Sequence, residues 1–403
     1  MAPLPRRSVL LGLAGLMAGC APGLQLGSRT WPWDAPAGSD ATGPAPMPLP
    51  TTPAERFGRG PVNVALILPL SGEPAVMQLG TALANASRLA VAFIEANPNI
   101  GENITISLRD TGTTAAGATS AAQASVAEGA KLILGPLMAE QVSAAGAVAR
   151  AANVPLIGFA NNGNAAGPGV YVLNVLPEAE MKRALTYIRE QGFRAPAGVF
   201  PATPYGEALA TAFRQQAVAI GFSPSAVYTF SDVSEAGQIV AQAKPMIDMG
   251  TIDALFMPDR ASAPVFAGAL QQAGAISELM QVVGSADWSN DASLASQPGL
   301  AGAIYPAVDA SGLEAIRADY QARFGSPPPQ MATMAYTATI LANVNTLSLA
   351  PVPYDASLLT NPSGFNGRDG LFRFLSNGRS EYGLTIRKIG AGGAVSTVEG
   401  VKL

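Results

Sequence analysis

Short apolar runs recur along this sequence, and each ends in a loop that carries polar, aromatic or thioether side chains. Runs of this kind are typical of buried parallel strands, whose carboxyl ends meet along one edge of a sheet. Open α/β folds bind their ligands at that edge. The loops therefore predict a ligand-binding cleft, and they contribute Ser71, Leu137, Met138, Ala160, Asn161, Asn162, Tyr205, Asp259, Asp287 and Trp288.

Catalysis by paired carboxylates is the other chemistry to consider, because Asp110, Asp259 and Asp287 each follow an apolar run. Nothing in the sequence fixes the distances among these three side chains. The chain also lacks a Walker A run, a GxSxG elbow and a GxGxxG turn after a strand. We therefore predict a binding protein, without a cofactor, and not an enzyme.

The amino-acid composition excludes several kinds of site and partner. The chain has no histidine, which excludes a histidine-based triad, and its single cysteine excludes an intrachain disulfide. Only carboxylate or carbonyl ligands remain for a metal, and we predict no metal site. Charged residues make up 13% of the chain and the net charge is −4, so we expect no nucleic-acid partner.

The elements that position these loops are clearest between Lys131 and Asn162. The apolar run Leu132–Leu134 ends at Gly135-Pro136, where glycine frees the backbone and proline removes a donor. A helical face follows, made by Met138, Val142, Ala145, Val148 and Ala152. A second apolar run, Val154–Phe159, completes a predicted strand–helix–strand unit.

The same alternation continues along the chain and predicts an α/β fold in two lobes, each with a doubly wound, mostly parallel sheet flanked by helices. Residues 62–176 form the first lobe, in which Val62–Leu68 is the first strand, and residues 177–304 form the second. We expect a crossing strand at Asn174–Pro177. A strand at Ala303–Pro306 is expected to lead back to the first lobe, to which residues 305–362 return. Residues 363–403 form a hairpin that crosses between the lobes, with its turn at Asn377-Gly378.

The first nineteen residues have the pattern of a signal peptide, with Arg6 and Arg7 before a short apolar segment. The sequence Met17-Ala18-Gly19-Cys20 resembles a bacterial lipobox, which implies lipidation of Cys20. The alternative is an ordinary signal peptide with an incidental cysteine, and the export route, Sec or twin-arginine, stays open. Residues 20–61 are rich in proline and glycine and predict a tether. Ala21 after the cysteine favours the outer membrane over the inner, facing the periplasm.

The runs GPLMAEQV, from Gly135, and VPLIGFANN, from Val154, resemble the central segment of the penicillin-binding-protein activator lipoproteins. More broadly, the chain from Val62 onward resembles the type I periplasmic binding proteins of the leucine-binding kind. That resemblance implies the two-lobed type I fold, in which linking segments allow closure about a cleft.

In leucine-binding proteins, hydroxyls and amides of the first lobe hold the substrate carboxylate, and an acid of the second lobe holds its ammonium group. The resemblance gives the acid role to Asp287, and Tyr205 and Trp288 would wall an apolar pocket. Leu137 and Met138 replace the hydroxyl-bearing loop and supply no side-chain donor. A structural role is the alternative: Tyr205 and Trp288 would pack in the core, and Asn161 and Asn162 would cap a turn.

Two hypotheses follow. The first is a lipid-anchored regulator of peptidoglycan synthesis that contacts a penicillin-binding protein, as the activator resemblance implies. The second is a substrate-binding lipoprotein of an ABC importer for amino acids or related small solutes. Both place the folded part of the chain in the periplasm, with the membrane reached through the N-terminal lipid.

Overall fold

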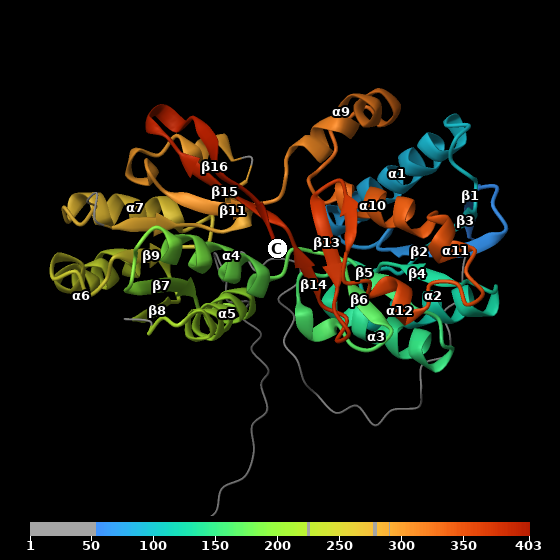
Figure 1. The fold of residues 1–403 in the computed structure, drawn as a ribbon, viewed down its shortest axis with the longest axis horizontal. Helices are drawn as coiled ribbons and strands as arrows, with labels where there is room; N and C mark the ends of the chain where they lie inside the picture. The colour runs from blue at the N-terminus through green and yellow to red at the C-terminus, as the bar shows by residue number, and fades with distance from the viewer. Residues whose placement is uncertain (1–53, 224–225, 277–279, 290) are drawn as a thin grey trace, which may run out of the picture. The chain divides into compact units, whose positions relative to one another are not determined.

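The computed structural model describes residues 54–223, 226–276, 280–289 and 291–403. These residues form two α/β lobes, each built on its own sheet, which confirms the predicted fold class (Figure 1). The predicted signal peptide, Cys20 and most of the predicted tether lie outside the described residues. Within the described ranges, no helix combines the length and apolar composition that a membrane span requires.

The first sheet has the strand order β1-β3-β2-β4-β5-β6. Its strands are β1 (Glu55–Gly58), β2 (Val62–Leu68), β3 (Ile104–Asp110), β4 (Leu132–Leu134), β5 (Leu156–Gly158) and β6 (Val170–Val172). All pairs are parallel except β1 with β3. The helices between the strands are α1 (Pro74–Ala96), α2 (Ala115–Ala127) and α3 (Ala139–Ala151), followed by the short turn η1 (Gly163–Ala165).

Gly135 shows why the loop after β4 has its sequence. Its φ is +86°, in the left-handed region, and a Cβ atom there would lie 2.1 Å from the carbonyl oxygen of Ile67. Only glycine allows this close approach between β4 and β2. The peptide bond from Gly135 to Pro136 is cis, and the Pro136 carbonyl accepts the N–H of Phe159 at 2.9 Å. The loop is thereby joined to the end of β5.

The second sheet has the order β16-β15-β11-β10-β9-β7-β8. Five strands are parallel: β7 (Pro196–Pro201), β8 (Val227–Phe230), β9 (Ala254–Phe256), β10 (Gln281–Val283) and β11 (Ile304–Ala307). β15 (Leu384–Ile389) and β16 (Val395–Lys402) are antiparallel additions. The connecting segments are α4 (Pro177–Glu190), α5 (Pro204–Ile220), η2 (Val233–Glu235), α6 (Ala236–Asp248), α7 (Ala263–Gln272), η3 (Ala286–Trp288), α8 (Ala292–Ala295) and η4 (Pro298–Leu300).

After β11 the chain rejoins the first lobe. There it forms α9 (Ser311–Phe324), α10 (Ala332–Ala342), α11 (Asn345–Ser348), α12 (Ala356–Leu359), β12 (Phe365–Gly367), β13 (Gly370–Phe374) and β14 (Ser380–Tyr382). α10 lies beside α1 (Figure 1), and a buried hydrogen bond of 2.8 Å joins the Ser87 and Thr339 hydroxyls. The hairpin β13–β14 turns at Asn377-Gly378 as predicted. Its Gly378 carbonyl accepts the N–H of Val172 in β6.

Gly383 separates β14, in the small antiparallel sheet of the first lobe, from β15, in the sheet of the second. The chain therefore passes from one lobe to the other three times: before α4, after β11 and at Gly383. Both lobes contain residues from the C-terminal segment.

Four details of the sequence prediction need correction. Asn174–Pro177 is not a strand, because Pro177 opens α4 and the last strand before it is β6. Ala303–Pro306 does not return to the first lobe, since β11 pairs with β10 and β15 in the second sheet. Residues 55–58, predicted as tether, form β1 at the edge of the first sheet. The edge strand β16 was not predicted.

Candidate functional site

The carboxyl edge of the second sheet gathers acidic and phenolic side chains. Tyr205 lies in the first turn of α5, which Thr203 caps by accepting the Gly206 N–H at 3.1 Å. Asp259 follows β9 and Asp287 follows β10, the strand beside it. Glu180, in the first turn of α4, joins them because its Oε2 accepts the N–H of Ala286 at 3.0 Å.

Glu180 is the most perturbed acid of this group. It is 4% exposed, and burial raises its pKa to about 8. The hydrogen bond from Ala286 opposes the rise, and the charge of Asp287 adds to it. At neutral pH the carboxyl is therefore mostly protonated and keeps an O–H group that can donate a hydrogen bond.

Asp287 and Tyr205 share this environment. Partial burial raises the pKa of Asp287. The charge of Arg260 opposes this rise, and the charges of Asp259 and Asp291 add to it. The pKa of Tyr205 is well above its usual value because the phenol is buried and faces Glu180, Asp287 and Asp259. The phenol therefore stays protonated, and this edge of the second sheet carries an excess of negative charge.

Arg260 offsets part of that charge. Its Nε lies 4.0 Å from Asp287 Oδ2 and 3.8 Å from Asp291 Oδ2. The Asp287 side chain nevertheless remains half exposed. Asp259 is engaged differently, since its Oδ2 accepts the N–H of Ser262 at 2.8 Å. Asp287 is thus the acid of the group that is best placed to meet a ligand.

Trp288 is a buried residue in the loop after β10. It is 1% exposed, and its Nε1 donates to the Pro258 carbonyl at 3.1 Å. The same carbonyl accepts the Ser285 hydroxyl at 2.7 Å, which ties the loops after β9 and β10 together. A Cβ at Gly284 would lie 2.3 Å from the indole ring, so glycine is required beneath it. Trp288 therefore packs in the core, which is the structural alternative predicted from the sequence, and it does not wall a pocket.

The carboxyl edge of the first sheet is arranged differently. Ser71 is exposed after β2 and lies near Asp110 at the end of the neighbouring β3. Partial burial favours a higher pKa for Asp110, but hydrogen bonds from the Ser71 hydroxyl and the N–H groups of Gly112, Leu70 and Ser71 outweigh it and hold the pKa below the usual value. Asp110 therefore organises the loop that presents Ser71.

The remaining predicted residues follow β4 and β5. Leu137 and Met138 are half-buried, and Ala160 is buried. Asn161 is exposed, and Asn162 caps the short turn after β5 by accepting the Asn164 N–H at 2.9 Å. This edge therefore offers Asn161, Ser71, backbone groups and apolar side chains to a ligand.

The structure brings Tyr205, Asp259 and Asp287 together on the second lobe, and it aligns Ser71, Leu137, Met138, Ala160, Asn161 and Asn162 along the first-lobe edge. Glu180 and Arg260 were missed by the sequence prediction. An acid in the first turn of a helix usually serves only the helix dipole, so Glu180 gave no recognisable signal. Its burial against the loop after β10 is visible only in the fold.

Among the described residues, no cluster of three or more histidine, cysteine, aspartate or glutamate side chains is arranged to hold a metal ion.

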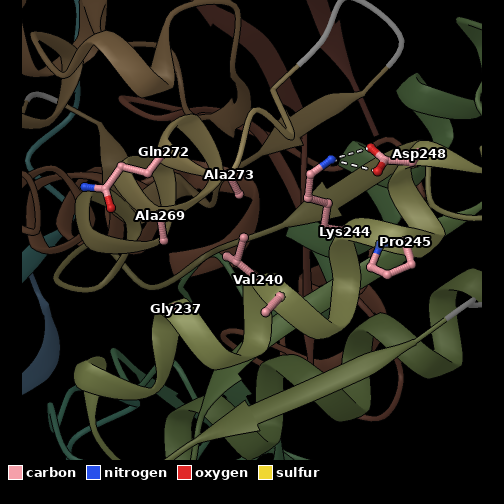
Figure 2. A pocket seen from close by; sticks show the side chains of 9 residues that line it. Gly237, Val240, Lys244, Pro245, Asp248, Ala269, Gln272 and Ala273 are labelled. Carbon is pink, nitrogen blue, oxygen red and sulfur yellow. Dashed lines mark hydrogen bonds and ion pairs between the residues drawn. The ribbon is translucent and has the colours of Figure 1, made fainter.

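A hollow of about 530 Å³ lies away from the acidic group of the second lobe, between α6 and α7 (Figure 2). Its two charged side chains, Lys244 and Asp248, pair with each other at 2.7 Å, and its other walls are mostly small residues. We do not include it in the site.

Comparison with known proteins gives a consistent result. A family model described as "Periplasmic binding protein" matches residues 61–370. A search of curated protein sequences gave no match.

Solved structures share the fold at low sequence identity. A protein from Rhodospirillum rubrum, described as a branched-chain amino acid ABC transporter, has a TM-score of 0.71 and 19% identity over 84% of this chain and 99% of its own. The isoleucine complex of a branched-chain amino acid transporter substrate binding protein from Streptococcus pneumoniae has a TM-score of 0.56, with the same identity and coverage. A solute binding protein from R. palustris in complex with benzoate has a TM-score of 0.57 and 17% identity, over 85% of this chain and 96% of its own.

Proposed function

The chain belongs to the periplasmic binding protein family, and from that premise we propose that it is a solute-binding protein that delivers a small amine-bearing ligand to an ABC importer. Its fold relatives include proteins described as amino-acid transport components, one of them in complex with isoleucine. The proposal makes the chain a binding protein and not an enzyme. It selects the second of the two hypotheses drawn from the sequence.

The acid group of the second lobe is the observation that carries this proposal. Asp287 is half exposed, and its negative charge is only partly offset by Arg260 at 4.0 Å. A ligand ammonium group would meet Asp287, while the protonated Glu180 and the Tyr205 phenol remain available as hydrogen-bond donors. The first-lobe loops would contact the rest of the solute through Ser71, Leu137, Met138, Ala160, Asn161 and Asn162.

Ligand binding to the full chain tests this proposal. We expect a saturable rise in melting temperature with isoleucine, leucinamide or putrescine at millimolar concentration, because a bound ligand stabilises the folded state. Asp287→Asn should weaken that binding about tenfold or more, since a charge-assisted hydrogen bond is lost. Asp248→Asn is the matched control: it removes an acid of the same lobe that pairs with Lys244, and it should change nothing.

The same binding measurements, extended to benzoate, can also contradict the proposal. Benzoate is the counter-ligand, because it is an anion without an amine. If benzoate binds, the amines do not, and Asp287→Asn leaves the affinity unchanged, the acid group is not the recognition element.

We further propose that residues 1–19 direct export, that Cys20 is lipidated and that the protein faces the periplasm, at the outer membrane in preference to the inner. The pattern of Arg6, Arg7 and the lipobox-like residues supports this. Mass spectrometry of the N-terminal peptide from membranes should show an acylated Cys20. Cys20→Ser should release the protein into the soluble fraction, and recovery of unmodified Cys20 from a membrane-free fraction would contradict lipidation.

Regulation of a penicillin-binding protein is the second candidate, and the run from Gly135 to Val142 is its support. In the structure these residues have roles within the fold. Gly135 allows the approach to Ile67, and Gln141 is buried with its Nε2 donating to the Gly112 carbonyl at 2.9 Å. Such roles explain the pattern without a protein partner. A cross-linked pull-down from cells that recovers a penicillin-binding protein, and loses it with surface changes on α3, would reinstate this candidate.

A further inference from the structure

A second hollow lies in the first lobe, away from the loops described above. It has a volume of about 320 Å³ and lies among the end of α1, α10 and β12. Phe93, Tyr336, Ile340, Val344, Phe365 and Arg368 form its main walls. The volume is at the lower end of the range of small-molecule sites, roughly 300–1,000 Å³.

One end of this hollow lies at the amino edge of the first sheet. α1 runs back from the carboxyl edge, so Phe93, near its last residue, is at the opposite edge. The end of α10 is fixed there as well, because the Asn103 N–H, just before β3, donates to Asn343 Oδ1 at 2.9 Å. The hollow is therefore separate from the loops that follow the strands.

The walls are more exposed than a packed core requires. Phe93 is 43% exposed and Val344 is 37% exposed. Tyr336 and Ile340 are four residues apart on α10 and so present one face. A bound apolar group would remove this surface from water, and the stabilisation would grow with the apolar area that it covers.

The hollow also contains one cation. Arg368 lies over the Tyr336 ring, with 4.8 Å between its Cζ and the ring centroid, and its Nη2 donates to the Tyr336 hydroxyl at 3.2 Å. Among the described residues no carboxylate pairs with it. The adjacent Asp369 accepts from Gln330 Nε2 at 3.0 Å and from the Thr333 hydroxyl at 2.8 Å instead. The remaining donors of the guanidinium suit a bidentate anion.

We propose that this hollow is a second ligand site, and that it binds a small amphipathic monocarboxylate, such as a medium-chain fatty acid. The carboxylate pairs with Arg368, and the apolar chain lies against Phe93, Ile340 and Phe365. The combination of an unpaired cation with an exposed apolar wall selects this class over neutral or cationic solutes. The inference does not depend on the proposed transport function.

Ligand-detected NMR and calorimetry on the full chain test the site with octanoate and its neutral counterpart, octanol. We expect saturable octanoate binding and much weaker octanol binding. Arg368→Gln should weaken octanoate about tenfold or more, because the charge-assisted pair is lost. Phe93→Ala, at an exposed position, should weaken both ligands without unfolding the lobe.

Two controls separate this site from others. Arg317→Gln removes an arginine of the same lobe that already pairs with Glu314 at 2.7 Å, and it should not change octanoate binding. Asp287→Asn tests the second-lobe group and should also leave octanoate binding unchanged. A melting curve for each variant excludes unfolding as the cause of any loss.

Three outcomes would overturn the proposal. Octanoate binding that survives both Arg368→Gln and Phe93→Ala would place the ligand elsewhere. Loss of octanoate binding in Asp287→Asn would assign it to the second-lobe group. If the protein sediments with phosphatidylglycerol vesicles in an Arg368-dependent way while free octanoate shows no saturable binding, the groove contacts a lipid surface and not a free acid.

Discussion

Asp110 and Glu180 are both carboxyl groups beside exposed loops, one at the edge of each sheet, yet their surroundings shift their pKa values in opposite directions. Asp110 receives hydrogen bonds from Ser71, Leu70 and Gly112, which hold its pKa below the usual value. Glu180 receives one from Ala286 and is otherwise buried, which raises its pKa to about 8. The first acid is ionised and organises its own loop, whereas the second is buried and mostly protonated at neutral pH.

The comparison shows that the acidic groups are concentrated at the second-lobe edge. The first-lobe edge supplies apolar side chains, Ser71, Asn161 and backbone groups, and the second-lobe edge supplies acids and phenol. A ligand that contacts both edges would place its positive group on the second lobe. Substitutions at Gly135, Glu180 and Asp110 test this difference between the two edges.

Gly135→Ala should break the first-lobe edge. The new Cβ would lie 2.1 Å from the Ile67 carbonyl, and the φ of +86° is unfavourable for alanine. We expect a loss of about 3 kcal/mol or more in the free energy of unfolding, measured in urea.

Gly129→Ala is the matched control for that substitution. Its φ is +79°, but nothing lies within 4 Å of the new Cβ. It should cost only about 1 kcal/mol, the strain of the left-handed conformation alone. Equal losses in the two variants would show that the approach of β4 to β2 is not what requires glycine.

Glu180 should make the protein less stable as the pH rises. Its folded pKa, about 8, is above the unfolded value of 4.5, so its contribution is complete below pH 4.5 and is lost as the pH rises through 8. The slope is roughly 1 kcal/mol per pH unit in that window. Urea melts of the wild type and Glu180→Gln, at several pH values, should differ by this slope, and parallel curves would contradict the buried acid.

Asp110 should behave in the opposite way. Its folded pKa is lowered, so its contribution is present above the unfolded value and is lost as the pH falls through the folded pKa. Because the group is largely exposed, we expect Asp110→Asn to cost only about 1 kcal/mol at neutral pH. The cost should shrink in acid, and a cost that persists at low pH would mean that shape, not charge, matters at this position.

The sequence predicted the fold well where local patterns decide it. β2, α3 and the Asn377-Gly378 hairpin follow from apolar periodicity and turn chemistry. It failed where a strand joins its sheet through distant pairing. β11 is a short buried run that fits either sheet, and β1 is an edge strand whose partner, β3, lies far away in sequence.

The site was harder to predict for a related reason. The positions of Asp259 and Asp287 follow from strand ends, because parallel strands align their carboxyl ends. The burial of a side chain does not follow from its position after a strand. Trp288 turns inward and packs over Gly284. Glu180 becomes part of the group only because α4 packs against the loop after β10.

The path of the last forty or so residues has a consequence for how the protein is made. Gly383 stands between a hairpin that the first lobe needs and two strands that the second lobe needs. A ribosome that stops before Leu384 therefore releases a chain in which β11 has an unprotected edge, open to pairing with other chains. Each lobe is made of segments that are not contiguous in the sequence. Expression of one lobe alone would therefore require these segments to be joined in a new order.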